Sequence, residues 1–146
     1  MPDDGTHRRL LASILVLPIN DPDNDVEQLR VNKNTLKQKL NDGESTVGPF
    51  VGFPSPAMVE TMGWMGFDFV VIDCEHGPMD FETAEHMIRA AELSGTTAIL
   101  RIGLNEQQHI QRYMDAGAAG VMIPLINNAA DGKKVVDAVK YPPMGK

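Results

Sequence analysis

Cysteine, aromatic residues, positive charge and long apolar runs are all scarce in this sequence of 146 residues. A single cysteine, Cys74, excludes a disulfide framework and any zinc site built from several cysteines. The 13 Lys and Arg residues face 20 Asp and Glu residues, a formal net charge of −7. Neither nucleic acid nor an anionic membrane is therefore expected as the main partner, because both require clustered cations. No apolar run approaches the roughly 18 residues that a membrane span needs.

Two common phosphate-binding motifs are also missing. The first predicted strand–helix turn, Gly52 to Ser55, does not carry G-x-G-x-x-G, and no G-x-x-x-x-G-K-[ST] occurs. These absences argue against a nucleotide-binding function. With 42% hydrophobic and 23% charged residues, the composition is that of one globular domain large enough to bury a core.

Residues 1–33 differ from the rest of the chain. A short apolar stretch, Leu10 to Leu17, follows two arginines, but Asp3 and Asp4 oppose a signal peptide, and no small-x-small cleavage site follows. The next residues, Asn20 to Asp25, form a turn-rich acidic segment. We expect a weakly ordered extension over 1–33 and a second unit over 34–146. The apolar stretch does not justify assigning a targeting signal, and with a single cysteine a cytoplasmic location is the default expectation.

From residue 34 onward, apolar strands alternate with amphipathic helices. A short helix over Asn34–Leu40 precedes four predicted strands, at Val47–Phe53, Phe67–Asp73, Thr97–Ile102 and Gly120–Ile126. Strand–helix alternation with short loops requires parallel strands joined by right-handed crossovers. The class is therefore α/β, either an open doubly wound sheet or part of a (β/α)8 barrel.

Capping residues mark where the helices between these strands begin and end. Gly66 and Gly95 close two of them, in the manner of C-terminal glycines. Side chains that can accept a hydrogen bond from the first helical turn precede each helix, and they are Ser55 (before Pro56), Asp80, Asn105 (with Gln108) and Asn128.

Polar residues cluster where the second and third strands end. Asp73 closes the second strand and is followed by Glu75 and His76, and Arg101 closes the third. In a parallel α/β fold the carboxyl ends of the strands share one edge, which is where chemistry occurs. Such groups are costly beside apolar strands unless they are paired or solvated. One interpretation of these four side chains is an ion-pair cluster that holds the loops together. Their occurrence together at one edge favours a functional site instead.

Other polar residues are weaker candidates. Cys74 lacks the surroundings of a cysteine protease or redox pair, so its small size at a strand end explains it better. His86 and His109 fall on predicted helices and are expected in solvent. Asp115, near the end of the third main helix, is ambiguous. The nine Met residues are spread over helices and strands and are expected to fill the core.

The segment Phe67-Asp68-Phe69-Val70-Val71-Ile72-Asp73-Cys74-Glu75-His76 resembles the F-D-x-x-x-I-D-x-E-H signature of the HpcH/HpaI aldolases. The resemblance covers about residues 34–146. Its further matching positions are Val47 to Phe50, Arg101, Asn105, Asp115 to Gly117, Val121 to Pro124 and Tyr141 to Gly145. Each piece alone is weak, but the joint pattern is specific.

The resemblance implies a (β/α)8 barrel of the phosphoenolpyruvate/pyruvate type, in a homo-oligomer that is usually a hexamer. The implied reaction is the reversible aldol cleavage of a 4-hydroxy-2-oxo acid, a small 2-oxo acid substrate, to pyruvate and an aldehyde. A divalent cation, Mg, Mn or Co, would chelate pyruvate as a Lewis acid.

Site residues follow from the matching positions. Arg101 would contact the ketone oxygen and stabilise the enolate, and His76 would be the acid/base group. Asp73 or Asp115 would orient the imidazole; the carboxylate at Asp115 is expected to reach a neighbouring subunit's site. Glu75 matches the motif and is counted with Arg101 among the substrate-binding residues.

The sequence also departs from the family pattern. The family's metal ligands, a Glu and an Asp on later strands, would lie beyond Lys146, so no metal ligand is expected within these residues. Residues 47–146 supply four of eight strands, so the C-terminal half of the barrel is missing and the isolated chain is expected to be inactive. The alternatives are a citrate-lyase-like or acyl-CoA lyase of the same superfamily, and a non-catalytic fragment that associates with full-length subunits or closes as a half-barrel homodimer.

Overall fold

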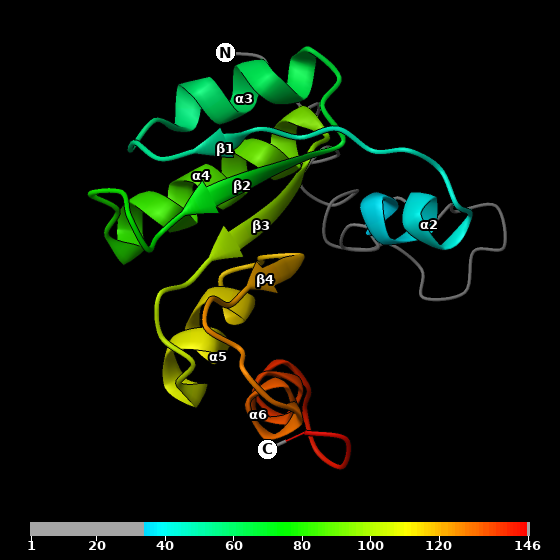
Figure 1. The fold of residues 1–146 in the computed structure, drawn as a ribbon. Helices are drawn as coiled ribbons and strands as arrows, with labels where there is room; N and C mark the ends of the chain where they lie inside the picture. The colour runs from blue at the N-terminus through cyan, green and yellow to red at the C-terminus, as the bar shows by residue number, and fades with distance from the viewer. Residues whose placement is uncertain (1–33, 146) are drawn as a thin grey trace, which may run out of the picture. The chain divides into compact units, whose positions relative to one another are not determined.

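The fold described here is that of a computed structural model, which describes residues 34–145. The predicted extension over 1–33 lies outside the described residues. Within 34–145 the elements alternate between helix and strand from α2 to α6, as Figure 1 shows. None of the described helices is long and apolar enough to cross a bilayer.

Four parallel strands form one sheet in the order β1-β2-β3-β4. Their bounds are Phe50–Val51, Phe69–Asp73, Thr97–Arg101 and Gly120–Met122. Sequential order means that each crossover leads to the adjacent strand and that the chain never reverses direction across the sheet. This is the arrangement of consecutive βα units in a (β/α)8 barrel, whereas a doubly wound sheet reverses its strand order.

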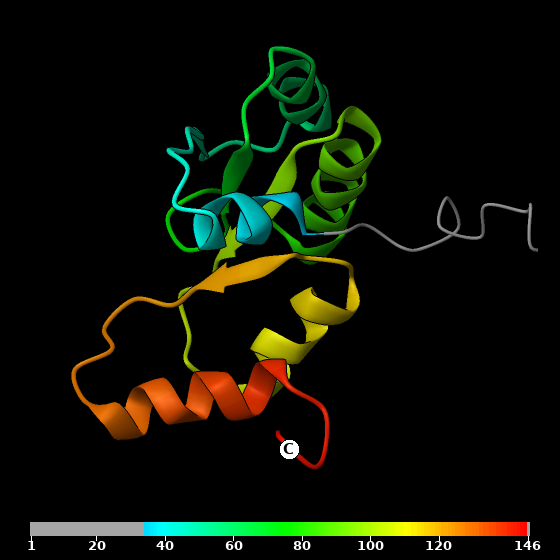
Figure 2. The same cartoon turned by 90° about the vertical axis from the view of Figure 1, so that its right-hand side faces the viewer.

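The four helices that follow the strands pack as two pairs, the first against the second and the third against the fourth, as Figures 1 and 2 show. They are α3 (Pro56–Trp64), α4 (Phe81–Ser94), α5 (Gln107–Asp115) and α6 (Ala129–Val139). Neighbouring helices α3 and α4 approach closely because Gly63 has no side chain: a Cβ there would lie 2.0 Å from Ser94 Oγ.

Helix α2 (Thr35–Asn41) lies against the loops that precede the strands. Asn34 caps it by accepting from the Lys37 backbone N–H at 2.9 Å, and its Nδ2 donates to the Ala119 carbonyl just before β4. Lys39 Nζ donates to Asp68 Oδ1 at 2.6 Å, just before β2. These contacts place α2 at the amino end of the sheet, opposite the edge where the predicted site residues lie.

The core lies between the sheet and its helices. The central strands are nearly continuous apolar runs, as expected of strands covered on both sides. The largest fully buried side chains are Ile72, Met87, Leu100, Ile110, Val51, Val59, Val70 and Val71. The edge strands leave Phe50 and Met122 exposed.

Most predicted boundaries are confirmed, with two corrections. Ser55, Asp80 and Asn128 cap their helices through the expected side-chain hydrogen bonds. The strands predicted at Val47–Phe53 and Gly120–Ile126 are shorter, because each lies at a sheet edge and pairs with one neighbour only.

The second correction concerns Asn105, which does not cap α5. Glu106 takes the cap position without a side-chain hydrogen bond. Asn105 Nδ2 instead donates to the Asp131 carbonyl at 3.2 Å, in the first turn of α6. The side chain that the local sequence assigned to the start of α5 thus makes a tertiary contact with the first turn of α6.

Candidate active site

Asp73 and Arg101 form the centre of the polar cluster. They close β2 and β3 and are direct partners in the parallel register. Arg101 Nε donates to Asp73 Oδ1 at 2.8 Å, and Nη2 donates to Oδ2, so the pair is bidentate. The Asp73 side chain is only 8% exposed. These hydrogen bonds from Arg101 hold the pKa of the Asp73 carboxyl well below its usual range, so the pair stays charged and the guanidinium is held in one orientation.

The turn after β2 is built around the same carboxylate. Asp73 Oδ1 also accepts the backbone N–H groups of Glu75 and His76, both at 3.1 Å. Gly77 completes the turn against the end of β1, where a Cβ would lie 2.6 Å from the Gly52 carbonyl oxygen. The turn is therefore held from both sides, and the backbone of His76 is fixed relative to Asp73.

Glu75 and His76 join the pair from this turn. Glu75 Oε2 lies 3.5 Å from Arg101 Nε and 3.8 Å from His76 Nδ1. His76 Nδ1 is also 4.0 Å from Asp73 Oδ2, and the imidazole side chain is 66% exposed. The structure thus brings together the four residues that the sequence placed at one edge: two carboxylates, a guanidinium and a solvent-accessible imidazole.

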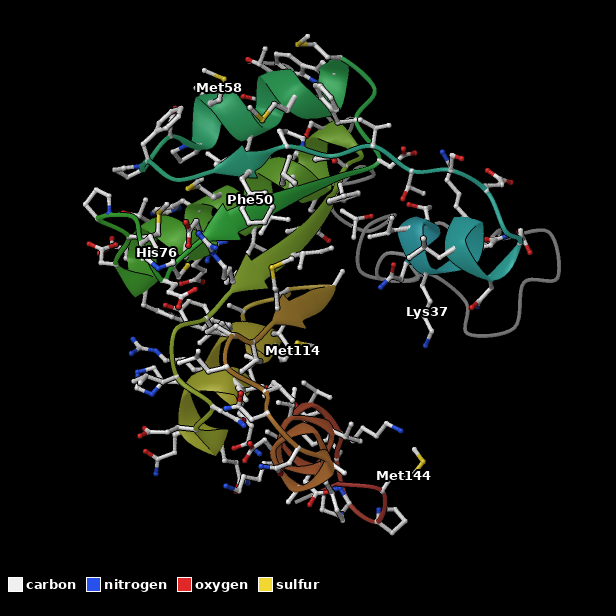
Figure 3. The ribbon with its side chains drawn as sticks, in the orientation of Figure 1. Lys37, Phe50, Met58, His76, Met114 and Met144 are labelled. Atoms are coloured by element: carbon white, nitrogen blue, oxygen red, sulfur yellow. The ribbon has the colours of Figure 1, made fainter. Side chains whose placement is uncertain are left out.

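Phe50 is a neighbour that the sequence interpretation missed. Its ring centroid lies 5.1 Å from Arg101 Cζ, within the range of a cation–π contact. Phe50 comes from β1, and Figure 3 labels it together with His76. The available signal was an aromatic residue in a predicted edge strand, but its position beside Arg101 depends on how the strands pack and could not be read from the sequence.

Asp115 does not join the cluster within this chain. It closes α5, and β4 begins five residues later at Gly120, so Asp115 lies at the amino end of the sheet. Its Oδ1 accepts from the Tyr141 hydroxyl at 2.7 Å. Of the two carboxylates expected to orient His76, only Asp73 lies near it, because a helix that starts at the carboxyl edge ends at the opposite one.

Cys74, His86 and His109 lie as expected, whereas the expectation that the Met residues fill the core is wrong for four that are exposed, Met58, Met65, Met122 and Met144. Cys74 is partly buried, and that burial raises the pKa of its thiol to about 11, which keeps it protonated and unreactive near neutrality. His86 lies on α4 beside Arg89, and His109 lies on α5 with its Nδ1 3.5 Å from Glu106 Oε2. Both rings are half exposed on helices.

The cluster does not fit a metal site by itself. Residues 34–145 contain no group of three His, Cys, Asp or Glu side chains that could hold a metal ion. Both oxygens of Asp73 accept hydrogen bonds from Arg101, so they are poorly placed to coordinate a cation. Two carboxylates against one guanidinium also leave the cluster with excess negative charge, unsuited to binding an anion without a further cation.

Comparisons with known proteins agree on one family. The family model described as HpcH/HpaI aldolase/citrate lyase matches residues 46–146. The chain is 35% identical to 2-dehydro-3,6-dideoxy-6-sulfogluconate aldolase of Pseudomonas putida (73% of this chain, 42% of the relative). It is 31% identical to a hydroxypyruvate/pyruvate aldolase of Roseobacter denitrificans (77% and 44%). The solved structure of the citrate synthase SbnG matches with a TM-score of 0.73 and 36% identity (77% and 46%). The chain therefore spans less than half the length of these relatives.

Proposed function

The chain belongs to the HpcH/HpaI aldolase/citrate lyase family, and from that premise we propose that it carries the arginine–histidine side of a metal-dependent aldolase site. The reaction would be the reversible cleavage of a 4-hydroxy-2-oxo acid to pyruvate and an aldehyde. Relatives named as aldolases of pyruvate, hydroxypyruvate and a sulfogluconate derivative support this class. A small 2-oxo acid would be the substrate and a homo-oligomer, in the family's usual form a hexamer, the assembly.

The bidentate Asp73–Arg101 pair is the observation that carries the proposal. Asp73 accepts one hydrogen bond from Nε and one from Nη2 of Arg101, which leaves both N–H groups of Nη1 and the second N–H group of Nη2 as donors for a ligand oxygen. Cleavage of the carbon–carbon bond converts the ketone of the pyruvate portion into an enolate. A cation that is already oriented toward the developing negative charge stabilises it without reorganising, which is the largest single contribution in many enzymes.

His76 supplies the proton transfer in this proposal. Its imidazole is exposed and lies at the same edge of the sheet as Arg101. It would take the proton from the substrate's 4-hydroxyl during cleavage and return it during condensation, directly or through one water molecule.

A divalent cation, when bound, would supply the positive charge that the cluster lacks. Since the described residues do not form a metal site, the expected ligands, a Glu and an Asp beyond Lys146, stay a prediction. For the same reason we expect the 146 residues by themselves to show no aldol turnover.

Substitution of the two residues in the full-length protein tests the proposal. Arg101→Ala and His76→Ala should abolish metal-dependent pyruvate release, measured by coupling to lactate dehydrogenase. Arg89→Ala is a matched control, since Arg89 is a half-exposed arginine on α4 that pairs with Glu85; it should keep wild-type activity. Unchanged turnover in both site variants would refute the assignment.

A citrate-lyase-like or acyl-CoA lyase is the second candidate. The match to a citrate synthase at 36% identity favours it, because citrate formation also joins a carbon nucleophile to a 2-oxo acid. Cleavage or consumption of a CoA thioester without pyruvate release would favour this reading over the aldolase.

A further inference from the structure

Three of the loops at the carboxyl edge of the sheet expose large apolar side chains to solvent. Phe53 lies in the loop after β1 and Leu104 in the loop after β3. Leu125 and Ile126 lie in the loop after β4, and Leu125 is 83% exposed. Single apolar side chains are common on protein surfaces, whereas a group of them at one edge indicates a binding surface. We call these four side chains the apolar rim.

Close contacts place two of these loops directly beside the polar cluster. The loop after β1 begins at Gly52, whose carbonyl oxygen would lie 2.6 Å from a Cβ on Gly77, in the turn after β2. The loop after β3 contains Gly103, where a Cβ would lie 3.3 Å from Glu75 Cγ. The apolar side chains that follow Gly52 and Gly103 in the chain are therefore neighbours of the turn that holds the cluster.

The loop after β4 has a backbone conformation that is rare for a leucine. The φ of Leu125 is 56°, in the left-handed region, and Asn127 Nδ2 donates to the Leu125 carbonyl oxygen at 3.0 Å. This loop follows Met122, the register partner of Arg101. Strained backbone of this kind is concentrated at functional sites, which favours a role for the exposed leucine in binding.

The loops at this edge carry negative charge and no Lys or Arg. Residues 52–55, 74–80, 102–106 and 123–128 contain neither, and the first turns of the four helices that follow contain neither. The loops do contain the carboxylates of Glu75, Asp80 and Glu106. Arg101, at the end of β3, already pairs with Asp73 and contacts the ketone oxygen in the proposed reaction. An anionic group placed against the apolar rim would lose water without gaining a cation, which is unfavourable.

We propose that the apolar rim receives the alkyl chain of an uncharged aliphatic aldehyde, in preference to an aldehyde that carries an acid group. The inference rests on the proposed function and names the class of its second substrate. In condensation, C3 of pyruvate loses a proton and bonds to the aldehyde carbon, and the aldehyde oxygen gains a proton to become the 4-hydroxyl. The chain on that carbon extends away from the pyruvate portion at Arg101, toward the loops that carry the rim.

Butanal and succinic semialdehyde are matched probes, because both have four carbons and they differ in a terminal methyl group against a carboxylate. The full-length protein is assayed with pyruvate, a divalent cation and each aldehyde, and the 4-hydroxy-2-oxo acid formed is quantified by chromatography. We expect kcat/KM to be at least about 10-fold higher for butanal, which is the discrimination that an apolar pocket gives for a small group.

The two ways in which this assay can fail have different meanings. Product formation without a preference for butanal, or with a preference for succinic semialdehyde, would overturn the inference and leave the aldolase function in place. No product from either aldehyde would refute the proposed function, and the inference with it.

A lysine on the apolar rim should change the preference. Leu125→Lys should raise kcat/KM for succinic semialdehyde relative to butanal by about 2- to 5-fold, the effect of one exposed ion pair, and high salt should reduce that gain. Leu104→Lys should act in the same direction. Leu125→Gln, which is polar but uncharged, should lower kcat/KM for butanal without raising it for succinic semialdehyde.

Leu93→Lys is the matched control for charge. Leu93 is as exposed as Leu125, but it lies near the end of α4, at the opposite edge of the sheet, so the ratio of the two kcat/KM values should stay at the wild-type value. A ratio that is also unchanged in both Leu125→Lys and Leu104→Lys would overturn the assignment of the rim.

Discussion

Gly77→Ala tests whether stability and catalysis require the close packing of the turn after β2 against the end of β1. Gly77 does not have a positive φ, so alanine is compatible with its backbone conformation and the effect is steric. The added Cβ would lie 2.6 Å from the Gly52 carbonyl oxygen and 2.9 Å from the Asp73 carbonyl oxygen. Both neighbours are backbone atoms, so neither can rotate away as a flexible side chain would.

The size of the effect follows from these distances. Ordinary van der Waals contact begins at 3.4 Å, so the turn has to withdraw from β1 by about 0.8 Å. Overpacking of this kind costs about 1–3 kcal/mol of stability. Because Glu75 and His76 lie in the same turn, they move with it, and a displacement near 1 Å reduces catalysis by roughly 100-fold.

Urea denaturation and kcat/KM for pyruvate release, both in the full-length protein, measure the two effects. Gly52→Ala is the matched control, because a Cβ at Gly52 meets nothing within 4 Å and its φ is not positive. We expect Gly52→Ala to resemble wild type in both assays. A Gly77→Ala protein with wild-type stability and turnover would show that the turn does not depend on this contact.

Two further substitutions test the core and the central ion pair. Leu100→Ala should lower the free energy of unfolding by roughly 2–5 kcal/mol, because Leu100 is 0% exposed. The control Leu93→Ala, at an 82% exposed position, should change the free energy of unfolding by less than about 0.5 kcal/mol. Equal effects of the two substitutions would contradict the assigned core. Because Arg101 holds the pKa of Asp73 below its unfolded value of roughly 3.9, the Asp73 carboxylate stabilises the fold above that pH and ceases to do so as the pH falls toward the folded-state pKa. The difference in stability between wild type and Asp73→Asn should therefore narrow between about pH 5 and pH 2; a constant difference would refute the coupling.

The sequence correctly predicted the features that depend on residues close together in the chain, such as helix caps and buried strands. Ser55, Asp80 and Asn128 were identified as helix caps because each precedes a segment with apolar residues at helical spacing. A short polar side chain at that position can accept a hydrogen bond from a backbone N–H group of the first helical turn. Apolar runs at β2 and β3 were recognised because strands covered on both sides require them. Asn105 was misassigned because its partner, the Asp131 carbonyl, lies in the first turn of a different helix, α6.

The sequence by itself determined the class of fold, the edge of the sheet where the polar groups meet and the family. All three depend on patterns that repeat along the chain or on short contiguous motifs. Only the tertiary structure decided how those groups pair. Asp73 and Arg101 are 28 residues apart and become bidentate partners through the β2–β3 register. Helix direction likewise carries Asp115 to the opposite edge, beside Tyr141. Register and helix direction are properties of the packed sheet, because they arise from contacts between segments that are distant in sequence.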